Sequence, residues 1–509
     1  MTTPTITGPL WADPGLDSRG GRYPLAVEAP VMAMIGTLIP GVSTLTTLAR
    51  YFTLYWALAA FADDHQLDAL TCQTMVRRSE VALALASHAF SSEPRAHGVD
   101  RVIAILDNGD PAQLTPHART SYSPRAWGFW SQYAGPSVAL GTVITDHGAL
   151  RAGRLACPPA VRTMFEPLLR TVAECDYPVD SADAPIELAP DQTDTPDLPV
   201  FADVFTAATS SSLIASDWTG DDRTRRETLR VATRAVQLSP AAPAWTDAMR
   251  QTLAYGDTIT TDPVFTAEQT ADRALAWRGV LLRHQSVGAW RRLWAALVEH
   301  VRAAKGTADR AALHEWITAE LPATTVDGFL AQCPRPVGPD GHPAPAEDEL
   351  LTRHRGDHGP LIVADLAILL IGGQRLEHLT GRARAAFLGY GSQSRGQFLD
   401  PRWMTYRHHE HAGRSLQELG RTVVDDMLAQ SRRVALRKLQ VGRDGRMTLF
   451  SRLHERNGRY FAEQPEGSGN VGLRIDQVHQ LSQQLGLATT QPDRTVITPY
   501  GQRLLGLPG

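Results

Sequence analysis

The hydrophobic pattern is most regular in the stretch around residue 480. Four aliphatic residues follow one another there at steps of three and four: Ile475, Val478, Leu481 and Leu485. This spacing places them on one face of an amphipathic helix. We expect Gly486 to end the helix, because glycine enters the left-handed C-cap conformation without a steric penalty. The pattern therefore predicts a short helix with one buried stripe.

The other side chains of this predicted helix are polar, and we expect them to face outward. They are Arg474, Gln477, His479, Gln480, Gln483 and Gln484. Among them, four are candidates for contacts with the edges of DNA bases, because amide and guanidinium groups pair well with those edges. These candidates are Arg474, Gln477, Gln480 and Gln484.

A hairpin and a second short helix are predicted to follow. The β-prone runs at residues 487–489 and 495–498 are joined by a polar turn that contains Pro492. Thr498 suits a helix N-cap, with Pro499 at the first helical position. Helix, two-stranded wing and closing helix is the order found in winged-helix domains, which this stretch resembles. The resemblance implies either DNA contact or docking of a partner protein.

Basic residues are concentrated just before this winged-helix-like module. From Ser431 to Tyr460 there are nine Lys or Arg residues and two acidic ones, in a chain whose formal net charge is −4. Such a concentration is typical of a surface that faces phosphates. The alternative is a solvated helix face. The predicted phosphate-binding residues are Arg432, Arg433, Arg437, Lys438 and Arg443.

The overall composition is that of an ordinary globular protein. The chain has 509 residues, of which 43% are hydrophobic and 20% charged. Its four cysteines form no CxxC pair, which argues against a cysteine zinc site and favours a reduced, cytoplasmic protein. Neither lysine, Lys305 or Lys438, follows a glycine, so no Walker A loop is present. We expect no cofactor.

The first 170 residues are predicted to form a helical domain with a small hairpin. Residues 29–49 are uncharged, long enough to span a bilayer, but Pro30, Gly36 and Pro40 interrupt them. We therefore expect a buried loop and helix, and no membrane as a partner.

The same region carries a second resemblance. It rests on Leu16-Asp17, Pro40-Gly41, Arg50-Tyr51 and Trp56. Their arrangement resembles uncharacterised bacterial proteins associated with anti-phage defence and mobile-element loci. The resemblance brings no catalytic motif, and it implies a biological context only.

An acidic stretch separates this domain from the rest. No Lys or Arg lies between Arg170 and Arg223, whereas twelve acidic residues lie from Glu174 to Asp222. Several prolines deny the stretch a continuous helix. The predicted fold is mainly α, a multi-helix scaffold with a few short hairpins. Its parts are residues 1–170, an acidic linker or insertion at 171–222, a helical middle domain at 223–400, and the basic helix with the winged-helix-like domain at 401–509.

Five histidines are the candidates for a metal site: His354, His358, His408, His409 and His411. Imidazole groups bind zinc or manganese, and a metal-bound water attacks phosphodiesters in nucleases. However, the second histidine of an HExxH motif is missing, because Gly413 stands at that position. Surface or capping histidines are the alternative, and we predict no metal.

These observations together predict a non-catalytic DNA-binding protein, acting as a subunit of a bacterial anti-phage defence or DNA-processing complex. The first alternative is a kleisin-like scaffold or adaptor whose winged-helix module docks a partner ATPase. The second alternative is a metal-dependent nuclease that uses the region of His354 and His408.

Overall fold

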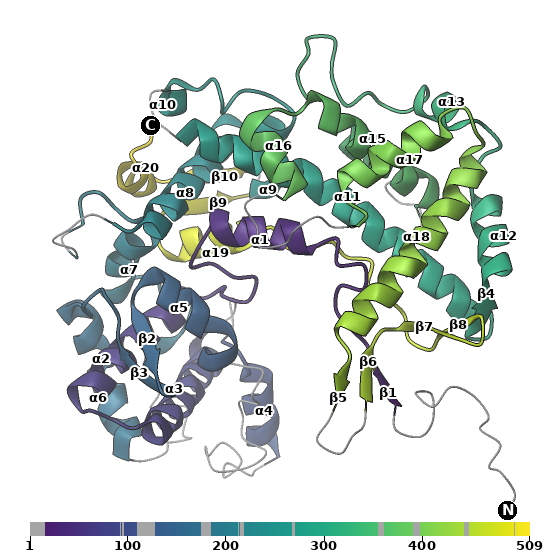
Figure 1. The fold of residues 1–509 in the computed structure, drawn as a ribbon. Coiled ribbons are helices and arrows are strands. Elements are labelled where there is room, and N and C mark those ends of the chain that lie inside the picture. The colour runs from purple at the N-terminus through teal and green to yellow at the C-terminus, as the bar shows by residue number, and fades with distance from the viewer. Residues whose placement is uncertain are drawn as a thin grey trace, which may run out of the picture. The chain divides into compact units, whose positions relative to one another are not determined.

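Helices dominate the fold, with a few short strands between them (Figure 1). The computed structural model describes residues 16–91, 93, 96–108, 128–174, 185–211, 213, 218–266, 270–354, 361–389, 398–441, 447–492 and 494–509. The predicted mainly α class with few short hairpins is confirmed. Within these residues, no helix has both the length and the apolar character needed to cross a bilayer.

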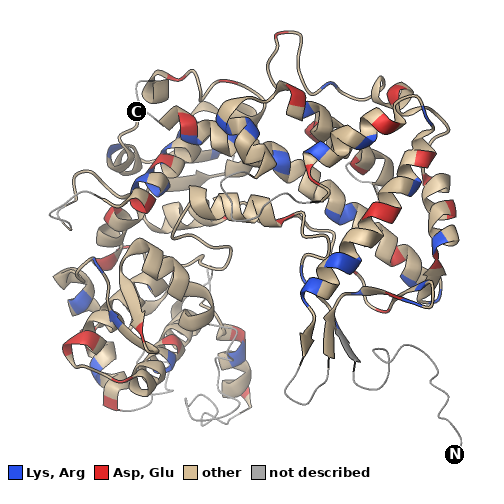
Figure 2. Cartoon of the chain, viewed as in Figure 1, with Lys and Arg blue, Asp and Glu red and all other residues tan. Residues whose placement is uncertain are grey.

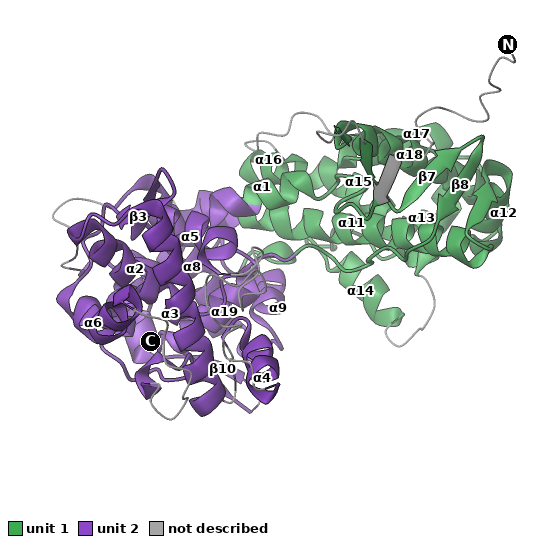
Figure 3. Cartoon of the chain, turned by 90° about the horizontal axis from the view of Figure 1, so that it is seen from below, with its two compact units in different colours: residues 1–34, 253–257, 275–471 green, residues 35–252, 258–274, 472–509 purple. Residues whose placement is uncertain are grey.

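The chain divides into two compact units (Figure 3). Unit 1 comprises residues 1–34, 253–257 and 275–471, and unit 2 comprises residues 35–252, 258–274 and 472–509. Three helices contain residues of both units: α1 (Ala29–Leu38), the π-helical η6 (Arg250–Ala254) and α11 (Thr270–Ala303). This division differs from the predicted domains. Residues 401–509, expected as one domain, are divided after Val471.

Unit 2 consists mainly of helices with two described hairpins. Its other helices are α2 (Ala49–Asp64), α3 (Ala69–Phe90), α4 (Val99–Asp107), η3 (Phe129–Tyr133), α5 (Ala134–Leu140), α6 (Pro159–Glu174), η5 (Ile186–Leu188), α7 (Asp197–Thr206), α8 (Gly220–Leu238), α9 (Trp245–Met249), α10 (Pro263–Thr266), α19 (Ile475–Gln484) and α20 (Pro499–Leu505). The antiparallel hairpins are β2 (Val143–Asp146) with β3 (Ala149–Ala152), and β9 (Ala488–Gln491) with β10 (Arg494–Ile497).

Helix α2 lies at the centre of the unit 2 core. It packs against α6, α7 and β3. Tyr51, Phe52 and Trp56 are all buried, as are their neighbours on every side of the helix. A helix that is apolar all round must be covered all round, so α2 fixes the positions of the elements about it.

The acidic stretch contributes to this core. Residues 175–184 lie outside the described residues, but α7 buries Leu198 and Phe201 in unit 2. Two of its carboxylates are buried against arginines: Asp197 pairs with Arg50, and Asp222 pairs with Arg225. Because buried charges require partners, part of the acidic excess balances internal arginines. The described part of residues 171–222 therefore differs from the predicted linker.

Unit 1 combines helices with two small sheets. Its other helices are α12 (Arg310–Glu320), α13 (Val326–Leu330), α14 (Ala346–Arg353), α15 (Ile362–His378), α16 (Gly381–Leu388), α17 (Pro401–His411) and α18 (Leu416–Arg437). Its strands are β1 (Leu16–Arg19), β4 (Thr307–Asp309), β5 (Gln440–Val441), β6 (Met447–Phe450), β7 (Leu453–Arg456) and β8 (Arg459–Ala462).

Helix α18 and the strands after it place the candidate site. One sheet has the order β1-β6-β5, with β1 parallel to β6, and the other has the antiparallel order β4-β8-β7. Helix α18 packs on α12 and α17. Gly420 permits the close approach to α12, since a Cβ there would lie 2.3 Å from Leu321 Cδ1. The N-terminal half of α18 is thus held between helices, and its C-terminal half lies beside the strands.

Candidate nucleic-acid interface

Three predicted phosphate-binding residues are exposed on the C-terminal half of α18. Arg432, Arg433 and Arg437 all lie on the surface of unit 1, and the Arg432 side chain is 68% exposed. Arg433 and Arg437 are four residues apart and therefore share one helix face. Figure 2 shows the basic positions on this part of α18.

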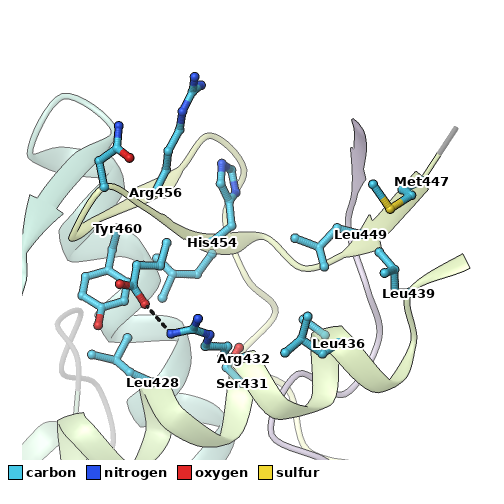
Figure 4. A pocket seen from close by; sticks show the side chains of 14 residues that line it. Leu428, Ser431, Arg432, Leu436, Leu439, Met447, Leu449, His454, Arg456 and Tyr460 are labelled. Carbon is cyan, nitrogen blue, oxygen red and sulfur yellow. Dashed lines mark hydrogen bonds and ion pairs between the residues drawn. The ribbon is translucent and has the colours of Figure 1, made fainter. Parts of the chain in front are cut away.

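An apolar hollow lies between this half of α18 and the strands. It encloses about 410 Å³, and Figure 4 shows α18 on one side and β6 and β7 on the other. Its aliphatic lining consists of Leu428, Ala435, Leu436, Leu439, Met447, Leu449 and Leu453. Its polar lining consists of Ser431, Arg432, His454, Glu455, Arg456, Asn457 and Tyr460. We call this hollow the α18 groove.

A second hollow of about 470 Å³ adjoins the α18 groove. The two share Leu428, Arg432, Leu436, Glu455 and Tyr460. The second is also lined by Arg310, Asp425, Ala429 and Arg433. Four arginines line the two hollows: Arg310, Arg432, Arg433 and Arg456. Arg437 is exposed one turn beyond Arg433 on α18, and we call these five arginines together the arginine surface.

A tight turn presents Arg456 at the end of β7. Asn457 and Gly458 follow it with φ angles of 52° and 73°. Positive φ at both central residues is the requirement of a type I′ hairpin turn, which Asn-Gly satisfies best. The antiparallel pairing of β7 with β8 continues from this turn, with Arg456 opposite Arg459. The Asn-Gly pair is therefore the local reason for the position of Arg456 at the groove.

The ion pairs of the arginine surface differ in strength. Arg432 Nη1 lies 3.3 Å from Glu455 Oε2, and both side chains are partly exposed, so the pair is weak. Arg310 donates to both oxygens of Asp425 at 2.7 and 2.6 Å. Burial works against the charge of Asp425, but its hydrogen bonds with Arg310 and His314 outweigh burial and lower its pKa. The Arg310 pair is therefore the tighter of the two.

Of the two other predicted phosphate-binding residues, Lys438 does not join this surface, and the position of Arg443 is not described. Lys438 Nζ donates to the carbonyl oxygens of Arg22 and Tyr23, the latter at 3.2 Å. Burial lowers the pKa of Lys438, and the side chain is directed at the backbone that follows β1. Arg443 lies outside the described residues. Conversely, the sequence prediction omits Arg310, which the pairing of β4 with β8 and the packing of α12 on α18 bring near the basic stretch.

The local structure of the C-terminal stretch follows the sequence pattern. The four aliphatic residues of the predicted stripe on α19 are buried, and Gly486 has a φ of 67°. The hairpin β9–β10 follows, and Thr498 Oγ1 accepts a hydrogen bond from Gly501 N at 3.0 Å as the cap of α20. Helix, hairpin and closing helix are therefore confirmed as elements.

The predicted polar outer face of α19 is partly wrong. Gln484 is only 8% exposed, and its Oε1 accepts from Ala49 N at 2.9 Å while its Nε2 donates to Thr47 O at 2.8 Å. Arg474 Nη1 donates to Val42 O at 2.7 Å, and burial lowers the pKa of Arg474. The start of α2 and the loop before it cover this side of α19. Of the predicted base-contacting residues, Gln480 is exposed and Gln477 is partly buried.

The candidate metal-binding histidines have other surroundings. His408 Nε2 lies 3.2 Å from Asp327 Oδ1, and its ring stacks on that of His409. His411 is buried, which lowers its pKa. His354 is described, whereas His358 lies outside the described residues. Throughout the described ranges, no three His, Cys, Asp or Glu side chains are grouped to hold a metal ion.

No protein-family model matches this chain. No curated protein and no solved structure matches it either. Guanidinium groups beside an apolar hollow can bind an anion and cover an apolar group at the same time.

Proposed function

We propose that the arginine surface of unit 1 binds DNA through its phosphates, and that this chain performs no catalysis. The observation that carries the proposal is the exposure of Arg432, Arg433 and Arg437 on one end of α18. The chain has a formal net charge of −4, so this local basic excess is a specific feature of the surface. Guanidinium groups bind phosphate oxygens with two parallel hydrogen bonds.

The partners of these arginines leave them available to an anion. The exposed pair of Arg432 with Glu455 is worth about 1 kcal/mol or less, so a phosphate can replace the carboxylate. Arg433 lies over the ring of Phe398, with 4.5 Å from Cζ to the ring centroid. This contact orients the side chain without occupying its hydrogen-bond donors.

The binding that we propose depends little on base sequence. Gln484 is buried and Arg474 is bonded to Val42 O, so neither side chain supports the proposed contact with base edges. Phosphate contacts position a protein on DNA but carry no sequence information. From the N-terminal resemblance, we place this role, as part of the proposal, in a cytoplasmic bacterial anti-phage defence or DNA-processing complex.

A second candidate function is that of a scaffold or adaptor subunit, of the kind that kleisins provide to an ATPase. The observation that favours it is apolar exposure at the α18 groove. Leu436 and Leu439 both line the groove, and they are 60% and 36% exposed. Contiguous apolar surface often marks a protein interface. Co-purification with an ATPase, together with failure of the isolated chain to bind DNA, would favour this candidate.

Salt-titrated DNA binding tests the leading proposal. The full chain is titrated into labelled duplexes of unrelated sequence at increasing NaCl, and affinity is read by fluorescence anisotropy. Replacement of Arg432, Arg433 and Arg437 with Ala should weaken binding to every duplex. The slope of log K against log salt should decrease by about 2 to 3, since each lost phosphate contact contributes about 0.9.

The matched control is Arg170→Ala. Arg170 is 73% exposed on α6 and pairs with Glu166, so it resembles Arg432 in exposure and pairing but belongs to unit 2. This variant should bind DNA as the wild type does. Equal affinity and equal salt dependence of the wild type and the triple variant would contradict the proposal.

A further inference from the structure

The α18 groove has an apolar floor and a basic rim, and this combination indicates which form of DNA the surface takes. We propose that the groove holds an unpaired base, so that the chain binds single-stranded DNA in preference to duplex. This inference rests on the proposed function, because it assigns a substrate form to the same surface.

Leucine side chains form the apolar floor of the groove. Leu436 and Leu439 line the groove and remain 60% and 36% exposed. The outer surface of a duplex presents phosphates and sugars, and its stacked bases cannot cover these leucines. An unpaired base has an apolar face that can pack on them. Burial of apolar surface contributes about 25 cal/mol per Å², so an unpaired strand gains free energy that a duplex does not.

The size of the groove suits a ring-sized group. Its volume of about 410 Å³ lies within the range of roughly 300–1,000 Å³ that is typical of small-molecule sites. In Figure 4, Tyr460 and Leu428 lie at one end of the space and Met447 and Leu449 at the other. The groove is therefore elongated and can accept a flat, ring-sized group.

Positive charge lies beside the apolar floor. Arg432 lies between the two ends of the groove and is held by an exposed ion pair. Arg456, whose side chain points away from α18 in Figure 4, and Asn457 in the turn that follows β7 also line the groove. A nucleotide needs an apolar surface for the base and a cation for its phosphate at short range. An asparagine amide can also pair with the edge of a base. An uncharged apolar peptide would offer the arginine side chains no anionic group to bind.

The test compares single-stranded and duplex DNA on the full chain. The probes are a labelled oligothymidylate and a blunt duplex of equal length, each of about 20 nucleotides, since single-strand sites cover about 4–16 nucleotides. Leu436→Ser is the test variant, and the exposed position of the side chain keeps the fold intact. The matched control is Leu70→Ser, because Leu70 on α3 is 71% exposed and belongs to unit 2.

We expect the wild type to bind the single strand at least about fivefold more tightly than the duplex, since burial of about 40 Å² of apolar surface at about 25 cal/mol per Å² corresponds to about that factor. Leu436→Ser should remove about that preference and leave duplex affinity unchanged, whereas Leu70→Ser should change neither. Leu439→Ser should repeat the effect of Leu436→Ser. Circular dichroism verifies that all variants are folded.

Two outcomes would overturn the inference, and they are distinguishable. In the first outcome, both probes bind equally, Leu436→Ser changes neither affinity, and the triple arginine variant weakens both. This result contradicts the base-binding groove and leaves the DNA-binding proposal intact. Absence of binding to either probe at low salt contradicts both the base-binding groove and the DNA-binding proposal.

Discussion

Arg50 of α2 donates to both carboxylate oxygens of Asp197 at 2.6 Å, with both side chains buried in the core of unit 2. Thr53 Oγ1 donates to the same carboxylate at 2.6 Å, and Arg50 also donates to Thr195 Oγ1 at 2.9 Å. Burial lowers the pKa of Arg50, and the contact with Asp197 opposes that shift. The pair therefore joins α2 to the start of α7 through a nearly complete hydrogen-bond network.

Asp197→Ala should be strongly destabilising, because it leaves the Arg50 guanidinium buried without a counter-charge. We expect a loss of about 3–5 kcal/mol in the free energy of unfolding, measured by urea titration. The control is Asp64→Ala, which breaks the exposed pair of Asp64 with Arg162 and should lower stability by about 1 kcal/mol or less. Equal effects of the two variants would show that the buried pair holds α7 no better than a surface pair.

Glu455→Gln should increase DNA affinity under the proposed function. The change releases Arg432 from its pair at 3.3 Å and removes one negative charge beside the bound phosphates. We expect an increase of about twofold to fivefold at low salt, the size of one exposed ion pair, and a smaller increase at high salt, since screening weakens both effects. Anisotropy titrations at two salt concentrations measure it, and a decrease in affinity would contradict the assignment of Arg432.

The elements that the sequence predicts well depend on short-range rules. The buried stripe of α19, the C-cap at Gly486 and the N-cap at Thr498 each involve residues within a few positions of one another. Arg432 and Arg433 of the basic stretch are exposed, because charged side chains at a helix end remain in water unless a partner covers them.

The misjudged features depend on contacts between distant parts of the chain. Gln484 bonds to Ala49, which is 435 positions away in the sequence, and periodicity alone cannot indicate that a second segment covers a polar face. Likewise, β1 pairs with β6, which brings Leu16 beside Met447. The α18 groove escaped prediction for a related reason: Leu436 and Leu439 look like core residues in the sequence, and only the fold leaves them exposed.

Asp365 should make the stability of unit 1 depend on pH. It is buried on α15 and accepts from Arg292 at 2.6 Å, yet burial outweighs this pair and raises the pKa of Asp365 to about 6. The usual value is about 3.9. Between these values the folded state holds the proton more tightly than the unfolded state. The contribution of Asp365 to stability is therefore greatest at low pH and falls as pH rises through about 6.

Asp365→Asn isolates this contribution, because the amide keeps the size of the side chain but does not titrate. The free energy of unfolding of the wild type minus that of the variant should fall by about 2–3 kcal/mol between about pH 4 and pH 6, and should be constant above that window. Urea titrations at closely spaced pH values measure the difference. If the difference in unfolding free energy rises with pH instead, the ion pair with Arg292 outweighs burial and the pKa of Asp365 is lowered.

Gln484→Ala should destabilise unit 2, whereas Gln480→Ala should not. Both glutamines lie on α19, but Gln484 is buried with hydrogen bonds to Ala49 N and Thr47 O, and Gln480 is exposed. Truncation at Gln484 leaves the buried Ala49 N and the partly buried Thr47 O without this partner, so we expect a loss of about 2–3 kcal/mol. The exposed site should change stability by no more than about 0.5 kcal/mol.

DNA affinity, measured on the folded protein, should be the same in both variants and the wild type, because α19 is not part of the arginine surface. If the stable Gln480→Ala variant loses DNA affinity, the prediction that α19 contacts bases would be supported instead.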